Sequence, residues 1–201
     1  MTEQSRSEIT RGRILARGRD LVLAGGFGGI GLSRILAESE VPKGSFYHYF
    51  PSKEAFGCAM LEDYVAGYLA RFDALAEGPA PAGETLAAYW RSWLDDARTE
   101  GLASRCLVVK LAAEVADLSE PMRRILDDGV GQLIGRIAGL LRRGAADGSI
   151  RPVPDPARTA RALYAEWLGA AILAKLARDE APLRRAFEDT LARMAPEAPR
   201  G

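Results

Sequence analysis

The segment Val41–Lys53 interleaves polar, aromatic and basic side chains over a short stretch of sequence. Lys43 and Lys53 are suited to neutralising phosphates, while Tyr47 and His48 offer hydrogen bonds to phosphates or base edges. This combination predicts a surface that contacts nucleic acid. The residues predicted to bind DNA are Ser33, Lys43, Gly44, Ser45, Tyr47, His48 and Lys53.

Cys106 is a second residue with evident chemistry. It follows Arg105 at the predicted start of a helix, with Lys110 one turn later. A helix N-terminus and a neighbouring guanidinium both favour the thiolate, which is the reactive form of cysteine. From the residues alone, an inert buried thiol is the alternative. The other cysteine, Cys58, is interpreted as a core residue.

Three predicted helices position the first group of residues. A helix over Ser7–Ala24 is ended by two glycines, a second helix spans Leu32–Glu38, and a third spans Lys43–Tyr49. This is the layout of a helix-turn-helix, in which the second helix of the pair lies in the major groove. The side chains expected to pack this pair against the first helix are Ile35, Leu36, Val41, Phe46 and Phe50.

The segment Gly25–Gly31 contains five glycines. A phosphate-binding loop is one interpretation of such a cluster. The segment lacks the Lys-Ser/Thr ending of a P-loop, however, and no predicted strand precedes it. We therefore interpret it as the turn between the first two helices.

The rest of the chain is helical in its periodicity, with no convincing alternating strand. Ser52 is a natural N-cap for a linking helix over Lys53–Ala76. Further helices are predicted at Thr85–Glu100, Arg105–Ala116, Glu120–Asp147, Pro156–Arg178 and Pro182–Met194. The prediction is an all-α fold of about nine helices. A helix-turn-helix DNA-binding domain occupies residues 1–51, and a helical regulatory and dimerisation domain occupies residues 52–201.

Two apolar groups in the second domain suggest what that domain does. The candidates for lining a ligand pocket are Tyr89, Trp90, Trp93, Lys110 and Trp167. The alternative is that the aromatic members form packed core. Apolar stripes on the last two helices predict a four-helix dimer interface. Their members are Leu163, Trp167, Ala170, Ala171, Leu183, Phe187 and Leu191.

Composition narrows the function classes. Residues 1–53 carry eight Lys and Arg against five Asp and Glu, whereas the remainder carries 19 against 22. A basic head on a mildly acidic body is expected of a phosphate-binding module joined to a domain that does not bind DNA. Two cysteines and one histidine predict neither a disulfide framework nor a metal site, and no cofactor is expected.

Location and enzyme chemistry are constrained in the same way. The chain has no apolar run of membrane-spanning length and no apolar region of a signal peptide, which predicts a cytoplasmic protein without membrane contact. An enzyme with Cys106 as nucleophile and His48 as base is disfavoured, because the only histidine lies in the predicted DNA-binding helix.

The chain resembles the TetR family of bacterial transcriptional regulators. The resemblance is specific in Gly26-Phe27, in Pro42–Phe50 and in Ser52-Lys53, although Pro42 stands where the family usually has a small polar residue. The resemblance implies a homodimer that binds a palindromic operator and usually represses until a ligand or modification releases it.

A second resemblance concerns the mode of release. Ser104–Leu111 and Ala113–Ser119, together with Val41–Gly57 and Leu163–Leu176, are similar to a branch of the family that responds to electrophiles and bleach. This resemblance implies that Cys106 is the redox sensor and that Lys175 is its reaction partner. Acrylate-responsive regulators share parts of the pattern, so release by a reversibly bound small apolar ligand is the alternative.

Overall fold

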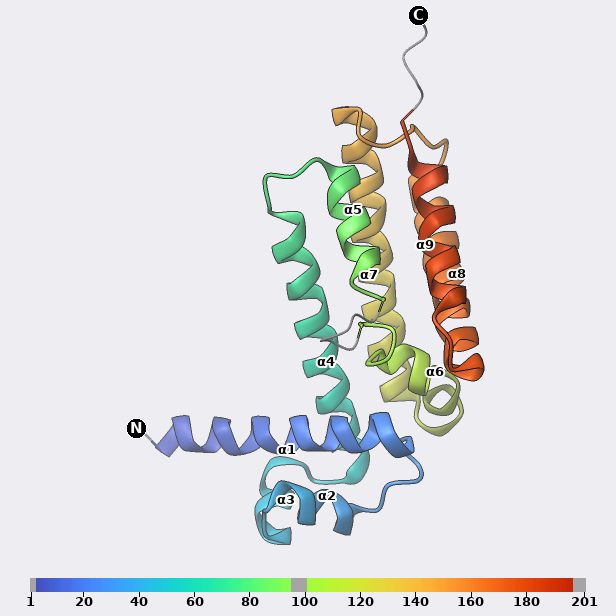
Figure 1. The fold of residues 1–201 in the computed structure, drawn as a ribbon. Coiled ribbons are helices and arrows are strands. Elements are labelled where there is room, and N and C mark those ends of the chain that lie inside the picture. Colours follow the sequence, from blue (N-terminus) through green and yellow to red (C-terminus); the bar gives the residue numbers. More distant parts are fainter. Residues whose placement is uncertain (1–2, 95–100, 197–201) are drawn as a thin grey trace, which may run out of the picture. The chain divides into compact units, whose positions relative to one another are not determined.

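The computed structural model describes residues 3–94 and 101–196. These residues form nine α-helices and no strand, which confirms the predicted all-α fold (Figure 1). In chain order the helices are α1 (Glu3–Gly25), α2 (Leu32–Ser39), α3 (Lys43–Tyr49), α4 (Lys53–Ala76), α5 (Ala82–Arg91), α6 (Leu107–Leu118), α7 (Glu120–Asp147), α8 (Pro156–Ala177) and α9 (Ala181–Met194). None of the described helices combines the length and apolarity needed to cross a membrane.

The chain divides into two compact units that do not follow sequence order. The head unit comprises residues 1–67 and 110–128, and the body unit comprises residues 68–109 and 129–201. Helices α4, α6 and α7 each contribute residues to both units. The predicted helix-turn-helix therefore shares its compact unit with most of α6 and the start of α7.

The head unit is built on an aromatic core. Phe46 of α3 and Phe56 of α4 are buried with Phe50 between them, and the three ring centroids lie 5.3–5.6 Å apart. The rings meet at tilted or edge-on angles, the arrangement that aromatic quadrupoles favour. Ile35 and Val41 are also buried, and Leu36 is half-buried, so the predicted packing of the α2–α3 pair is confirmed.

Local signals end and begin the helices of the head unit as predicted. Gly26 ends α1 with φ +77° and donates its N–H to Val22 O at 2.8 Å, a conformation in which glycine carries no Cβ penalty. Ser52 caps α4, because its Oγ accepts the N–H of Ala55 at 3.0 Å. Ser7 of α1 also donates its hydroxyl to the Tyr49 hydroxyl at 3.2 Å, joining α1 to α3.

The body unit is organised around three tryptophans. Trp90 lies in α5, Trp93 lies in the segment that follows α5, and Trp167 lies in α8; all three are fully buried. The Trp90 and Trp167 rings stack at 4.5 Å, and the Trp167 Nε1 donates to Thr190 Oγ1 at 3.1 Å. These contacts join α5, α8 and α9 in one core. At the start of α8, Asp155 caps the first turn by accepting two backbone N–H groups at 3.0 Å.

The predicted bounds of α3, α4 and α7 are confirmed to the residue, but the predicted helix over Thr85–Glu100 is wrong at its end. Helix α5 stops at Arg91. The Ser92 hydroxyl donates to Tyr89 O at 2.6 Å, and the Leu102 N–H donates back to Ser92 O at 2.8 Å. These contacts turn the chain away from the helix axis. Residues 95–100 of that prediction lie outside the described residues.

The predicted dimer stripe is also corrected. Within the single chain, Leu163, Trp167, Ala170, Ala171 and Leu183 are buried and Phe187 is half-buried, whereas Leu191 is exposed. Helix α8 is apolar on more than one side. Its exposed large apolar side chains are Ile172, Leu173 and Leu176, and α9 adds Leu191.

Candidate DNA-binding surface and sensor site

Helix α3 exposes the side chains that the sequence assigns to DNA. Lys43, Tyr47 and His48 are exposed, and Ser45 is half-buried. The helix has only two turns, so its orientation depends on Phe46, which is fully buried and contacts the Tyr47 ring edge-on at 5.7 Å. The DNA contacts themselves remain predictions, and exposure of these side chains is the property that they require.

The other three residues predicted to bind DNA are Gly44, in the first turn of α3, Ser33 of α2 and Lys53 of α4. Gly44 is exposed, and a Cβ added there would meet no heavy atom within 4 Å, so the backbone is open to close approach. Ser33 is exposed in the first turn of α2. Lys53 is half-buried, and its Nζ donates to Phe27 O at 2.8 Å. The predicted phosphate contact of Lys53 therefore competes with a contact inside the protein.

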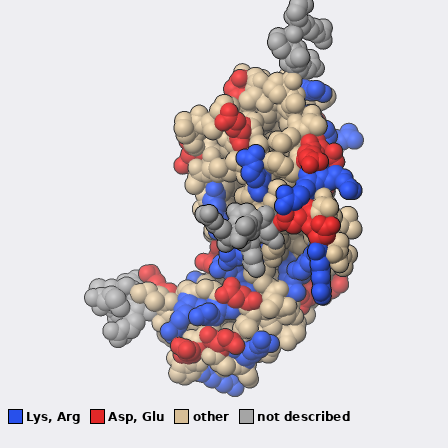
Figure 2. Space-filling view, in the orientation of Figure 1, with Lys and Arg blue, Asp and Glu red and all other residues tan. Residues whose placement is uncertain are grey.

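The surface charge is mixed. On the face drawn in Figure 2, Lys and Arg side chains alternate with Asp and Glu side chains. The excess of basic residues in 1–53 is therefore spread among acidic neighbours on this face. Affinity for DNA then depends on a few placed contacts as well as on net charge.

Cys106 lies at the N-cap position of α6. Its Sγ accepts the backbone N–H of Val109 at 3.5 Å, three residues along the chain, and its side chain is only 3% exposed. A sulfur at this position receives both an N–H donor and the positive end of the helix dipole, which stabilise a thiolate. The predicted setting of this cysteine at a helix start is therefore confirmed.

Two tyrosines record the electrostatic surroundings of Cys106. Burial raises the pKa of Tyr89 well above its usual value, its hydrogen bond with Tyr68 partly opposes this shift, and the electrostatic effect of Cys106 adds a smaller rise. Burial likewise raises the pKa of Tyr164, with the Cys106 charge as the next cause. Both phenols therefore remain neutral at physiological pH, and their hydroxyl hydrogens remain available for hydrogen bonds.

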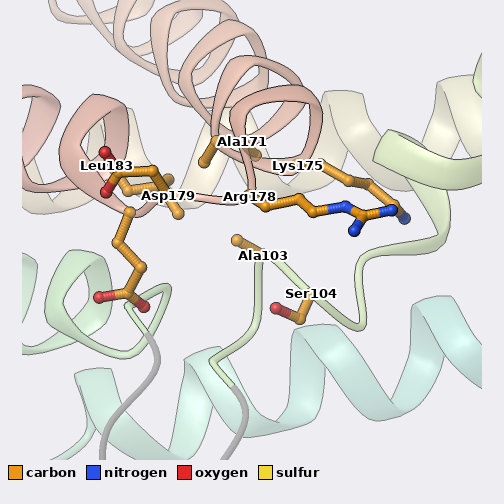
Figure 3. Close-up of a pocket in the computed structure, with 9 residues that line it drawn as sticks. Ala103, Ser104, Ala171, Lys175, Arg178, Asp179 and Leu183 are labelled. Carbon is orange, nitrogen blue, oxygen red and sulfur yellow. The ribbon is translucent and has the colours of Figure 1, made fainter.

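A cavity of about 300 Å³ lies beside the segment that leads to Cys106. Its walls come from Ala103, Ser104, Ala171, Ala174, Lys175, Arg178, Asp179, Glu180 and Leu183. Figure 3 shows the Lys175 and Arg178 side chains pointing to the same side of this pocket, with Ala103 and Ser104 on the segment opposite. The structure therefore brings Lys175 to the segment that precedes Cys106, and the partnership of Lys175 with Cys106 itself remains a prediction.

The five predicted ligand-pocket residues do not lie together: four aromatic side chains pack in the body unit, and Lys110 belongs to the head unit. Tyr89, Trp90, Trp93 and Trp167 are buried and pack ring against ring, with Tyr89 and Trp90 centroids 4.6 Å apart. None of them lines the cavity that contains Lys175. Lys110 belongs to the head unit, where its Nζ donates to Ala24 O at 3.4 Å. A pocket role for these five residues remains a prediction.

Sequence reasoning missed Glu114, whose carboxylate contacts the glycine turn. It accepts the N–H of Phe27 at 3.1 Å and the N–H of Gly28. These partners lie 87 and 86 residues away in the chain, and no local pattern signals such a contact. The glycine cluster is thus a turn, as predicted, and its N–H groups hold an anion that the protein itself supplies.

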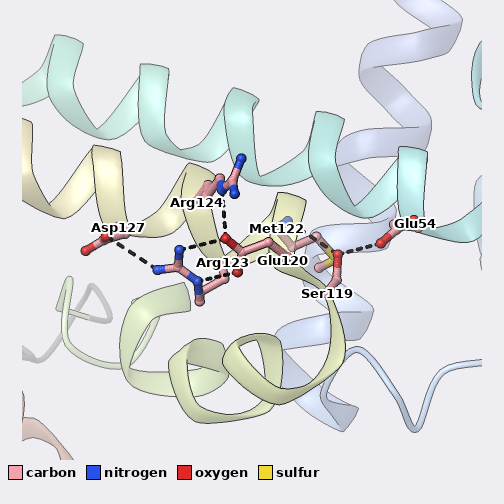
Figure 4. A network of polar contacts seen from close by, with 7 residues as sticks. All are labelled: Glu54, Ser119, Glu120, Met122, Arg123, Arg124 and Asp127. Atoms are coloured by element: carbon pink, nitrogen blue, oxygen red, sulfur yellow. Dashed lines mark hydrogen bonds and ion pairs between the residues drawn. The ribbon is translucent and has the colours of Figure 1, made fainter.

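A second polar network joins the start of α7 to α4 within the head unit (Figure 4). Ser119 donates its hydroxyl to Glu54 Oε1 at 2.6 Å and accepts the N–H of Met122 at 3.4 Å. Glu120 bonds both Arg123 and Arg124, and these guanidinium groups lower the pKa of its carboxyl to about 2. The turn between α6 and α7 is therefore tied to the helix that follows α3.

Comparisons with known proteins cover nearly the whole chain. Residues 14–56 match the family described as bacterial regulatory proteins, tetR family, and residues 82–189 match the Tetracyclin repressor-like C-terminal domain. The chain is 44% identical over 179 residues to the HTH-type transcriptional repressor NemR of Escherichia coli strain K12, covering 89% of this chain and 90% of that protein.

One further relative and one solved structure extend the comparison. The transcriptional regulator AcuR of Cereibacter sphaeroides is 34% identical over 153 residues, covering 75% of this chain and 69% of that protein. The crystal structure of the reduced form of E. coli NemR aligns with a TM-score of 0.86 and 41% identity, covering 94% of this chain and 98% of that chain. Sequence and structure thus agree on the same relatives.

Proposed function

Because this chain belongs to the TetR family of bacterial transcriptional regulators, we propose that it is a cytoplasmic homodimeric repressor that releases its operator when Cys106 is oxidised or alkylated. The family and the relatives with high identity are regulators and not enzymes. The observation that carries the proposal is the position of Cys106, whose sulfur caps α6 and which follows a segment, Ala103 and Ser104, that lines the same pocket as Lys175.

The DNA-binding part of the proposal uses the exposed face of α3. Lys43 meets a backbone phosphate, while Tyr47 and His48 reach phosphates or base edges in the major groove. A palindromic operator needs two such helices about 34–36 Å apart, so the repressor must be a dimer.

The dimer interface is assigned to the exposed apolar side chains of α8 and α9. Leu176 is 77% exposed, Leu173 is 58% exposed, and Ile172 lies on the same helix. Leu191 of α9 is also exposed. Exposed apolar side chains gathered on one helix pair indicate a protein–protein contact, and a two-fold axis there builds a four-helix interface from two copies.

The chemistry at Cys106 proceeds in two balanced steps. The thiolate attacks hypochlorous acid and becomes a sulfenic acid, while chlorine leaves as chloride; sulfur is oxidised and chlorine is reduced. The amine of Lys175 then displaces the sulfenic oxygen, forming a sulfur–nitrogen bond and releasing water. Alternatively, the thiolate attacks an electrophilic carbon, such as that of a quinone, and the sulfur is alkylated.

Cys58 is a poor candidate for the same chemistry. Burial raises the pKa of its thiol, and the nearby carboxylates of Glu54 and Glu62 raise it further. Its thiolate is therefore disfavoured, in contrast to a cysteine at a helix N-terminus. Substitution of Cys58 provides a background in which only Cys106 reacts.

The second candidate function is release by a small, reversibly bound ligand. The cavity of about 300 Å³ beside Ala103 and Ser104 favours it, because this volume falls within the range of small-molecule sites. Lys175 and Arg178 supply its cationic side. In this alternative Cys106 is a packing residue.

The experiment compares Cys58→Ser with Cys58→Ser/Cys106→Ser. Binding to a labelled duplex from the region upstream of the protein's own gene is measured before and after stoichiometric hypochlorite. Release of DNA only by the protein that retains Cys106 supports the thiol switch. The oxidised protein should then be lighter than the reduced protein by two hydrogens, and this loss of mass should be absent when Lys175 is substituted. Equal binding by both proteins, unaffected by oxidant, contradicts it and favours the reversible ligand.

A further inference from the structure

The glycine turn between α1 and α2 is shaped around a carboxylate. The Phe27 N–H donates to Glu114 Oε2 at 3.1 Å, and the Gly28 N–H donates to Glu114 Oε1. A Cβ added at Gly26 or Gly28 would lie 3.0 or 2.9 Å from a Glu114 oxygen, and Gly26 has φ +77°. Successive N–H groups in a turn form an anion-binding concavity, and Glu114 fills it.

Phe27 contacts two opposite charges: its N–H donates to the Glu114 carboxylate, and its carbonyl accepts from the Lys53 ammonium. Its carbonyl accepts Lys53 Nζ at 2.8 Å, and the same ammonium lies 4.7 Å from the centroid of its ring. Burial lowers the pKa of Lys53, and the charge of Glu114 opposes that shift. Lys110, one turn before Glu114 on α6, donates to Ala24 O at 3.4 Å. Three charged side chains therefore fix the end of α1 and the turn.

This turn sets the entry to the DNA-binding helices. Helix α2 begins at Leu32, four residues after Gly28, and α3 follows after three residues. A shift of the turn therefore moves the helix pair that must fit the major groove. The contact from α6 is made by a carboxylate that accepts two N–H donors at once, the stronger class of hydrogen bond.

We propose that Glu114 is a positioning residue for operator binding: its carboxylate occupies the N–H groups of Phe27 and Gly28 and keeps α2 and α3 in the DNA-binding arrangement. Its coupling to release rests on the function proposed above. Cys106 caps the start of α6, and Glu114 lies two turns further along the same helix. Modification of the sulfur removes the cap and displaces the helix that carries Glu114.

The test is Glu114→Gln, with Asp117→Asn as the matched control. An amide accepts one of the two N–H donors and turns its own N–H groups toward the other. Asp117 is an exposed carboxylate on the same helix. Kd for the upstream duplex is measured for reduced and hypochlorite-treated protein, together with Tm. We expect reduced Glu114→Gln to bind on the order of tenfold more weakly and to lose most of its remaining response to oxidant. Asp117→Asn should match the wild type.

The outcomes separate this inference from the proposed function. Where the wild type responds to oxidant, a purely structural role would lower Tm and leave the ratio of oxidised to reduced Kd the same in Glu114→Gln as in the wild type, which overturns the positioning role. Unchanged affinity of reduced Glu114→Gln also overturns it. If wild-type protein ignores oxidant but Glu114→Gln still binds weakly, the positioning role stands and the thiol switch fails.

A second variant covers the case in which Glu114→Gln does not fold. Gly28→Ala does not change Glu114 itself. The added methyl group would lie 2.9 Å from Glu114 Oε1, so it should push the carboxylate away from the turn. We expect the same weakened operator binding. The control is Gly31→Ala, three residues along, where an added Cβ meets no heavy atom within 4 Å. Equal affinity of the two alanine variants would contradict the positioning role.

Discussion

The glycine turn of the head unit and the tryptophan cluster of the body unit are both made by residues far apart in sequence, but they are held by different forces. Charged side chains fix the turn at Phe27, where a carboxylate and an ammonium contact the same residue. Ring stacking fixes the cluster, with Trp90 on Trp167 at 4.5 Å. Charge-assisted hydrogen bonds depend on direction and a single charge, whereas ring packing depends on volume.

This difference indicates which region is suited to switching. A small displacement breaks a directional contact such as that of Glu114. A packed aromatic core resists the same displacement, because its contacts are many and individually weak. The turn is therefore more sensitive than the tryptophan cluster to a small displacement of the residues that form it.

The largest effect is expected from removing volume in the tryptophan cluster. Trp167→Ala should lower the free energy of unfolding by roughly 3–5 kcal/mol, because it creates a cavity and leaves Thr190 without its donor. Urea unfolding followed by circular dichroism measures this change. Arg161→Ala, an exposed position on the same helix, is the control and should stay within about 0.5 kcal/mol. A loss below about 1 kcal/mol for Trp167→Ala would show that the cluster is not a tight core.

The next effect tests packing against the turn itself. Gly57→Ala places a Cβ 2.7 Å from the Phe27 ring and 2.8 Å from the Met122 sulfur. Overpacking should cost about 1–3 kcal/mol of unfolding free energy, although alanine is the better helix former. The control is Gly135→Ala on α7, where no heavy atom lies within 4 Å and a gain of up to about 1 kcal/mol is expected. Equal stabilisation by both alanines would mean that Phe27 has room to move.

The same contrast explains what the sequence was able to predict. Helices α3 and α4 were bounded correctly because their signals are local: Phe50-Pro51 ends one and Ser52 caps the other. The early end of α5 was not predictable, because the bond from Leu102 to Ser92 that accompanies it joins residues ten apart. Glu114 was missed for the same reason, since its partners lie in a turn 86 and 87 residues away.

The aromatic residues show a second limit of sequence. Tyr89, Trp90 and Trp93 have the spacing of one helix face, and that spacing fits a pocket wall or a packed core equally well. Only the three-dimensional contacts decide that they pack on Trp167. In the same way, the apolar stripe of α8 predicted a dimer face, but those residues are buried within the single chain, and Leu173 and Leu176 are exposed.

A smaller effect separates the two lysines assigned to phosphate. Lys43 is exposed, so Lys43→Met should lower the log–log salt slope of operator binding by about 0.9 and the affinity about eightfold at 0.1 M salt. The Lys53 ammonium already donates to Phe27 O. Lys53→Met should therefore weaken binding with a smaller change in slope. Fluorescence anisotropy across a salt series measures both. Equal changes in salt slope for Lys43→Met and Lys53→Met would mean that Lys53 contacts a phosphate in the complex and not the Phe27 carbonyl.

The smallest effect concerns an ion pair in the body unit whose two side chains are partly exposed to solvent. Arg136 donates to Asp73 through Nε at 2.7 Å and through Nη2 at 2.9 Å. This hydrogen-bonded guanidinium lowers the pKa of the Asp73 carboxyl, while partial burial acts in the opposite direction. A lowered pKa in the folded state means that the pair stabilises the protein above the unfolded-state pKa of about 3.9 and that this contribution is lost as pH falls below it.

Asp73→Asn should therefore be less stable than the wild type at pH 7 by less than about 1 kcal/mol, because both partners are partly exposed to solvent. The difference in Tm should shrink as pH falls from 5 to 3, since the wild-type carboxyl then takes up a proton and the two proteins become alike. Asp117→Asn, an exposed carboxylate on α6, should show almost no difference at any of these pH values. A gap for Asp73→Asn that persists unchanged at pH 3 would show that the bidentate geometry, rather than the charge, holds α4 to α7. The contrast with the turn would then be sharper, because the turn would depend on the charge of its carboxylate and this pair on its geometry.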